Sequence, residues 1–76
     1  MKDRWPNLQD LIDHKGAINI GQIAPISGAA VAMRGRQVHA MLRISVGESL
    51  AELLDRLDTA VAKAVDGGIP TDEINH

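Results

Sequence analysis

Residues 37–68, QVHAMLRISVGESLAELLDRLDTAVAKAVDGG, decide the fold of this chain. Up to residue 46, apolar side chains alternate with polar ones, which is the period of a strand with one buried face. From Ser49 onward the apolar residues recur every three or four positions, as they do along an amphipathic helix. The leucine and valine positions with this spacing are Leu50, Leu54, Leu57 and Val61. The sequence therefore predicts a strand that is followed by a long helix.

Both ends of the predicted long helix carry sequence signals. Ser49 and Glu52 match the Ser-x-x-Glu pattern of a capping box, in which each side chain accepts a hydrogen bond from the other residue's backbone N–H. Gly67 and Gly68 should end the helix, because glycine readily adopts the left-handed conformation that follows a last turn. Glu52 and Arg56 stand four residues apart and are expected to pair.

A shorter helix is predicted near the N-terminus, over residues 7–15. Pro6 suits its first turn, Asn7 is expected to cap it, and Gly16 can take the left-handed conformation that ends it. A helix of about nine residues is not stable alone, so it must pack on the rest of the chain.

Two further strands are predicted between these helices. Residues 17–23 alternate in polarity and predict the first strand. Residues 25–28 include a proline and a glycine and predict a loop, with the second strand over residues 29–33. Gly35 can supply the positive φ of a tight turn, so Arg34-Gly35-Arg36 predicts a hairpin.

These elements together predict an α+β fold in the order α-β-β-β-α. A short N-terminal helix precedes a three-stranded antiparallel meander, and the long C-terminal amphipathic helix is expected to pack on one face of the sheet. Residues 1–70 should form a single small domain, and residues 71–76 a frayed C-terminal tail.

The size and composition of the chain predict a homodimer. A chain of 76 residues buries only about 60% of the surface that its unfolded form exposes. It has no cysteine and only one aromatic residue, Trp5, so its core must be built from aliphatic side chains without disulfides. Trp5 and Met41 are the candidate partner-binding residues. Trp5 either packs over the edge between the first helix and the sheet or anchors a partner.

The charges of the chain are segregated along its length. Residues 17–46 contain no Asp or Glu but three arginines, whereas residues 47–76 contain seven carboxylates and two basic residues. Arg and Gln side chains can bond to phosphates and base edges, so the outward side of the third strand and its turn is a candidate nucleic-acid-binding surface. The candidate residues are Arg34, Arg36, Gln37, His39 and Arg43. The alternative is an ordinary solvated sheet face.

The long helix carries four carboxylates that are expected on its solvent side. These residues are Glu52, Asp55, Asp58 and Asp66. They form either a solvated face or a contact for the arginine-bearing hairpin of a second copy or another basic partner.

Several classes of function lack their usual sequence patterns here. The histidines, His14, His39 and His76, match no zinc-binding spacing, and no nucleophile or phosphate-binding motif is present. We therefore predict no enzymatic activity, no cofactor and no metal. The N-terminal residues lack the apolar segment of a secretory signal, and no apolar run approaches the roughly 20 residues of a membrane helix. A cytoplasmic protein without membrane contact is expected.

Part of the chain is similar to a known family. Residues 42–46, LRISV, and residues 50–57, LAELLDRL, resemble the strand and first helix of ribbon-helix-helix repressors, and residues 67–74, GGIPTDEI, resemble the start of their second helix. In that family the outward residues of the paired strand read DNA. The resemblance implies that role for His39, Met41 and Arg43.

Two functions are therefore expected as alternatives. The first is a small, non-enzymatic, homodimeric interaction or accessory module. The second is a dimeric DNA-binding transcriptional regulator that uses the arginine-bearing β-ribbon.

Overall fold

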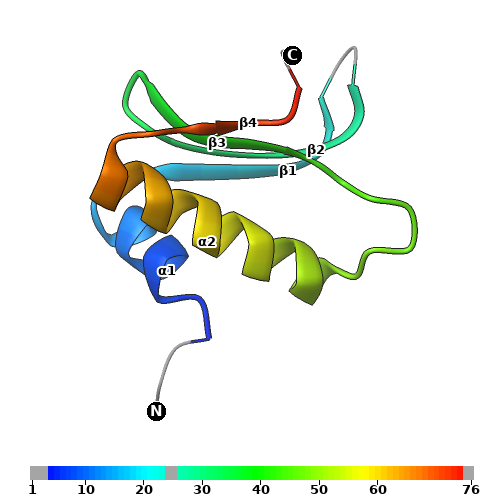
Figure 1. The fold of residues 1–76 in the computed structure, drawn as a ribbon, viewed down its shortest axis with the longest axis horizontal. Coiled ribbons are helices and arrows are strands. Elements are labelled where there is room, and N and C mark those ends of the chain that lie inside the picture. The colour runs from blue at the N-terminus through cyan, green and yellow to red at the C-terminus, as the bar shows by residue number, and fades with distance from the viewer. Residues whose placement is uncertain (1–3, 24–25, 75–76) are drawn as a thin grey trace.

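The computed structural model of this chain describes residues 4–23 and 26–74. A single sheet forms one layer, and both helices lie on the same face of it (Figure 1). The elements in order are α1 (Pro6–Asp13), β1 (Ala17–Ile23), β2 (Ile26–Arg34), β3 (Gln37–Arg43), α2 (Leu50–Gly67) and β4 (Thr71–Asp72). The predicted α+β class, with the long helix packed on the sheet, is confirmed.

The sheet has the order β1-β2-β3-β4. Strands β1, β2 and β3 form the predicted antiparallel meander. The short β4 pairs with β3 in parallel, which is possible because α2 carries the chain back along the sheet. Thr71 lies opposite Ala40, and the backbone N–H of Glu73 donates to the carbonyl of Met41 at 2.8 Å. The prediction of a frayed tail is therefore wrong for residues 71–74, and residues 75–76 lie outside the described residues.

Strand boundaries agree with the sequence pattern in part. β1 has the predicted bounds, and Gly35 has the positive φ, 59°, expected of the β2–β3 turn. β2 begins earlier than predicted, at Ile26, so that Ser27 and Gly28 belong to a strand rather than to a loop. The pairing continues past the end of β3, because the N–H of Ile44 donates to the carbonyl of Gly28 at 3.2 Å.

The core lies between the sheet and the helices. Its largest fully buried side chains are Leu42, Leu57 and Val61. On the sheet face that the helices cover, most of the buried side chains are alanines, and Ala32 lies opposite Ala40 in the β2–β3 register. Small side chains at these positions leave room for α2 to pack against the strands.

The two ends of α2 are built as predicted. The N–H of Glu52 donates to Ser49 Oγ at 3.1 Å and the N–H of Ser49 donates to Glu52 Oε1 at 2.9 Å, which completes the capping box. Gly68 has φ 69° and its N–H donates to the carbonyl of Ala64. No helix in the described part of the chain is long and apolar enough to cross a membrane.

The boundaries of α1 differ from the prediction. The helix runs over residues 6–13, and Trp5 rather than Asn7 stands at its N-cap position. The left-handed residue after it is Lys15, with φ 65°, rather than Gly16. Gly16 has a different role, because its N–H donates to the carbonyl of Leu11 at 2.8 Å and the backbone comes close to the Leu11 side chain there.

Candidate functional site

The predicted nucleic-acid-binding residues do not share one surface. Arg34, Arg36 and Gln37 are exposed at the β2–β3 turn, whereas Arg43 lies at the other end of β3. Arg43 is seven positions after Arg36 along the strand, which corresponds to roughly 20 Å at about 3.3 Å per residue. Arg43 also makes intramolecular contacts, since its Nε donates to the carbonyl of Glu73 at 3.3 Å.

The predicted outward orientation of His39 is wrong. The β2–β3 register pairs Ala32 with Ala40 but Met33 with Val38, so His39 is the extra residue of a β-bulge. A bulge re-aims the side chains on the strand that contains it. His39 is only 8% exposed and lines a small cavity of about 50 Å³ together with residues of both helices, among them Leu11 and Val61.

Trp5 and Met41, the predicted partner-binding residues, lie on opposite sides of the sheet. Met41 is half-buried and pairs with Val31, on the face that carries no helix. Trp5 packs against the core cluster from the helix side, and its Nε1–H donates to Asp55 Oδ1 at 2.7 Å. The packed position of Trp5 is one of its two predicted alternatives.

Two carboxylates of α2 hold the N-terminal segment, so they are not merely a solvated face. Asp58 Oδ1 accepts from the backbone N–H groups of Asn7 at 2.8 Å and Leu8 at 3.0 Å. Asp55 accepts from Arg4 and from Trp5, and these hydrogen bonds lower the pKa of the Asp55 carboxyl. The acidic side of the helix therefore fixes α1 in place.

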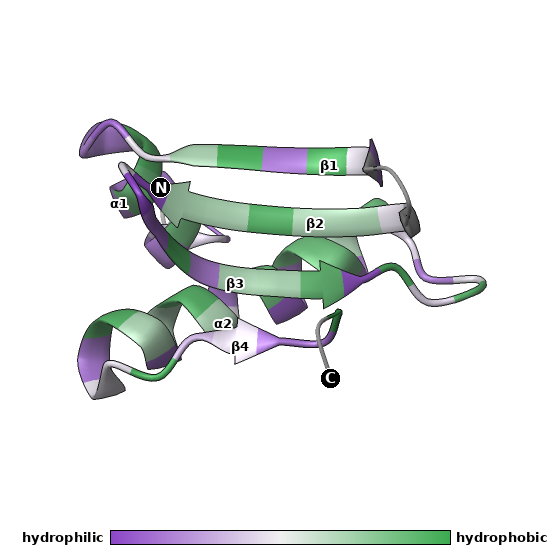
Figure 2. Ribbon diagram, turned by 90° about the horizontal axis from the view of Figure 1, so that it is seen from above, coloured by the Kyte–Doolittle hydropathy of each residue, from purple (hydrophilic) through white to green (hydrophobic). Residues whose placement is uncertain are grey.

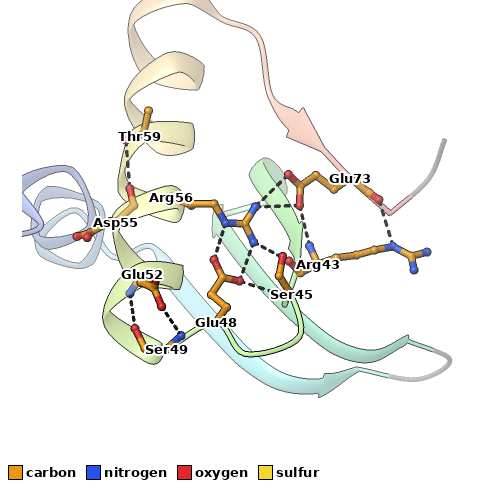
Figure 3. A network of polar contacts seen from close by, with 9 residues as sticks. All are labelled: Arg43, Ser45, Glu48, Ser49, Glu52, Asp55, Arg56, Thr59 and Glu73. Carbon is orange, nitrogen blue, oxygen red and sulfur yellow. Dashed lines mark hydrogen bonds and ion pairs between the residues drawn. The ribbon is translucent and has the colours of Figure 1, made fainter.

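Arg56 stands at the centre of a second polar network (Figure 3). Its Nε and Nη2 donate to the two carboxylate oxygens of Glu48 at 2.7 and 2.9 Å, and its Nη1 donates to Glu73 Oε2 at 3.1 Å. Its Nη2 also donates to the carbonyl of Arg43 at 2.7 Å. The guanidinium thus joins α2 to the end of β3 and to the segment after β4. The predicted partner, Glu52, is instead used in the capping box.

This network shifts the ionisation of Glu48 and Arg56. The guanidinium of Arg56 and, second, the backbone N–H of Ser45 lower the pKa of Glu48 to about 2. The hydrogen bonds from Arg56 to Glu48 and, to a lesser extent, to Glu73 raise the pKa of Arg56. Both groups therefore stay charged across the neutral range, and the network is a fixed structural connection rather than a proton donor or acceptor.

Grooves flank α2 on two sides. One lies between α2 and β4 as adjoining hollows of about 370 and 630 Å³, which share Thr59, Lys63 and Thr71. The other, of about 230 Å³, lies between the two helices and β1. It is lined by Trp5, Leu8, Gln9, Ile12, Ile18 and Leu54. Among the residues that the structure describes, no three His, Asp or Glu side chains are grouped where they could hold a metal ion.

The apolar surface beside this second groove was not identified from sequence. Ile12 is 49% exposed and Ile20 is 40% exposed, and Ile20 follows Ile18 on the same side of β1. One feature of the sequence does indicate this apolar surface, because residues 17–33 contain no charged side chain. No protein-family model matches the chain, and comparisons with curated proteins and with solved structures give no match either.

Proposed function

We propose that this protein is a non-enzymatic interaction module that acts as a homodimer. The observation that carries the proposal is that large apolar side chains are exposed on α1 and β1. These are Ile12, which lines the groove that contains Trp5, and Ile20, which follows another lining residue, Ile18, on the same side of β1. A domain of this size with an alanine-rich core gains stability when a partner covers such side chains. A second copy of the chain is the partner that we propose covers these side chains, since most soluble oligomers are formed by identical chains.

The groove between α2 and β4 supports binding rather than catalysis. Two of its three carboxylates are already engaged, Asp55 with Arg4 and Trp5, and Glu73 with Arg56, and the third, Asp66, is exposed near the end of α2. The lowered pKa of Asp55 keeps its carboxyl ionised near neutral pH. A general acid must carry a proton at that pH, so Asp55 does not suit this role.

The alternative proposal, a dimeric DNA-binding regulator, rests on fewer residues than the sequence indicated. Arg34, Arg36 and Gln37 remain exposed at the β2–β3 turn, but His39 is buried and Arg43 contacts Glu73. Titration with mixed-sequence duplex DNA at two salt concentrations tests this alternative, because phosphate contacts weaken steeply with salt. Salt-dependent amide shifts confined to the turn would support it, and unchanged spectra would contradict it.

The homodimer is tested by measuring the mass of the chain in solution. Light scattering over a range of concentrations should give twice the chain mass of 8.2 kDa. Ile12→Asn should weaken the dimer, whereas Ile69→Asn should not, because Ile69 is 71% exposed but follows α2 and lies outside the proposed surface. A monomer mass at every concentration would contradict the proposal.

A further inference from the structure

We propose that two copies of this chain join through β1, antiparallel and about a two-fold axis at Asn19, so that their sheets become continuous. This inference rests on the proposed homodimer and specifies how it forms. β1 is the outer strand of the sheet, and the side of it away from β2 carries no other strand of the described chain (Figure 2).

On that side, the backbone groups of β1 have no hydrogen-bond partner among residues 4–23 and 26–74. The bond from Ile44 N–H to the Gly28 carbonyl shows that the even-numbered residues of β2 face β3. The odd-numbered residues of β2 therefore face β1, and they pair with Ala17, Asn19 and Gly21. The N–H and C=O groups of Ile18 and Ile20 consequently point outward from the sheet edge, where another strand can bond to them.

The two edges of the sheet differ in how they are protected. On the β3 side, the edge is covered by the two-residue β4, which follows Pro70. Glu73 bonds to the carbonyl of Met41 and to the N–H of Arg43, and Arg56 donates to the carbonyl of Arg43. β1 lacks two of the usual protections, since AINIGQI contains no charge and no proline. Its one register shift lies beyond Gly21 and leaves the preceding residues regular.

A second copy fits this edge better than an arbitrary strand. The uncharged stretch of residues 17–33 lets two identical edges approach without any like-charge contact. Antiparallel pairing about a two-fold axis also makes the edge its own complement, since each outward residue meets an outward residue of the partner.

The apolar side chains select one register. With the axis at Asn19, Ile18 lies opposite the partner's Ile20, and Ile20 opposite the partner's Ile18, so that both isoleucines of each chain are paired. An axis at Ile20 would place Ile18 against the polar Gln22 of the partner subunit. An axis at Ile18 would place Ile20 against Gly16 of the partner subunit, where no side chain would cover it. Cross-strand apolar pairs stabilise a sheet, so the first register is favoured.

A cysteine at position 19 tests the inference directly. Asn19 would form a non-hydrogen-bonded pair with its own copy, at a Cα separation of about 4.5 Å, which is within the range of a disulfide. The chain has no cysteine, so Asn19→Cys introduces the only thiol. Mild oxidation should link this variant into a covalent dimer. Gln37→Cys, also exposed but at the far hairpin, is the matched control and should stay largely monomeric under denaturing conditions.

Hydrogen exchange provides a second readout that needs no cysteine. The amides of Ile18 and Ile20 should exchange slowly at high protein concentration and rapidly on dilution, whereas the Asn19 amide, bonded to β2 within one chain, should stay protected. Ile20→Lys places a charge at the edge and should raise the dimer dissociation constant at least about tenfold while the circular dichroism spectrum of the fold is kept.

The outcomes separate this inference from the proposed function. A chain that is monomeric at every concentration overturns both. A dimer in which Asn19→Cys gives no disulfide and the amides of Ile18 and Ile20 exchange rapidly at all concentrations overturns the β1 pairing alone. Efficient cross-linking of the Asn19→Cys variant, together with concentration-dependent protection of Ile18 and Ile20, supports it.

Discussion

Asp58 caps a helix to which it does not belong: its Oδ1 lies 2.8 Å from the backbone N of Asn7, in the first turn of α1. Its Oδ2 accepts from Asn7 Nδ2 at 2.9 Å, so both oxygens are used. The eight residues of α1 are too few for a stable isolated helix. A carboxylate from α2 supplies both the missing hydrogen-bond acceptor and a negative charge at the positive end of the α1 dipole.

Replacing Asp58 should therefore loosen α1. Asp58→Ala removes the acceptor for two backbone N–H groups, and we expect the free energy of unfolding to fall by about 1–2 kcal/mol, as for the loss of a helix cap. Urea denaturation at a fixed protein concentration measures it, since dimerisation makes stability concentration-dependent. Asp66→Ala, an exposed carboxylate near the end of the same helix, is the control and should change stability by less than about 0.5 kcal/mol. Equal effects of the two substitutions would contradict the cap.

Arg56 should matter through its geometry as well as its charge. Arg56→Lys keeps the positive charge but cannot contact Glu48, Glu73 and the Arg43 carbonyl together, so we expect a loss of about 1 kcal/mol. Arg56→Met should cost about 2 kcal/mol, because charged hydrogen bonds are lost and two carboxylates remain close. The control is Lys63→Met, which removes a cation from the same helix. Lys63 forms no ion pair with the described residues. An effect of Lys63→Met as large as that of Arg56→Met would contradict a specific network.

Stability should fall in acid because of the same network. The pKa of Glu48 is lowered from 4.5 to about 2, so the folded state binds its proton more weakly than the unfolded state does. The resulting stabilisation is complete above about pH 5 and is lost as the pH falls toward about 2. The lowered pKa values of Glu52 and Asp55 act in the same direction.

Denaturation curves between about pH 7 and 2 measure this dependence. Glu48→Gln should be less stable than the unaltered chain at neutral pH, and the difference should shrink as the pH approaches about 2, where Glu48 itself is protonated. The variant should therefore show a shallower decline in acid. A constant difference at all pH values would show that the charge of Glu48 is not the cause.

The parts of the fold that were predicted correctly depend on neighbouring residues. Ser49 and Glu52 are three positions apart, and Gly35 and Gly68 adopt backbone conformations that glycine favours. Each signal lies within a few residues of the structure it determines, so no knowledge of the rest of the chain was needed.

The features that were missed depend on distant residues. Asp58 and Asn7 are separated by 51 positions, and nothing near either residue indicates the other. Thr71 and Asp72 become a strand only because β3 offers them an edge. The sequence of β3 predicts an uninterrupted alternation through His39, but a bulge adds one residue there and shifts the pattern. The sequence does not indicate which edge of the sheet stays open, because β1 is left as the open edge only once β4 covers β3.

We expect the stability of the fold to require glycine at position 16, because a side chain there would clash with Leu11. A Cβ added there would lie 2.5 Å from the side chain of Leu11, which is buried in the core, and 2.7 Å from the backbone carbonyl oxygen of the same residue, so that the backbone would have to shift. Gly16→Ala should therefore reduce the free energy of unfolding by about 1–3 kcal/mol, as overpacking does. Gly67→Ala is the matched control, because a Cβ on the last residue of α2 meets nothing within 4 Å. Alanine is favoured over glycine in helices, so Gly67→Ala should be neutral or stabilise by up to about 1 kcal/mol. Thermal and urea denaturation of the two variants decide the point, and equal stability of Gly16→Ala and the unaltered chain would show that the α1–β1 connection can relax around Leu11.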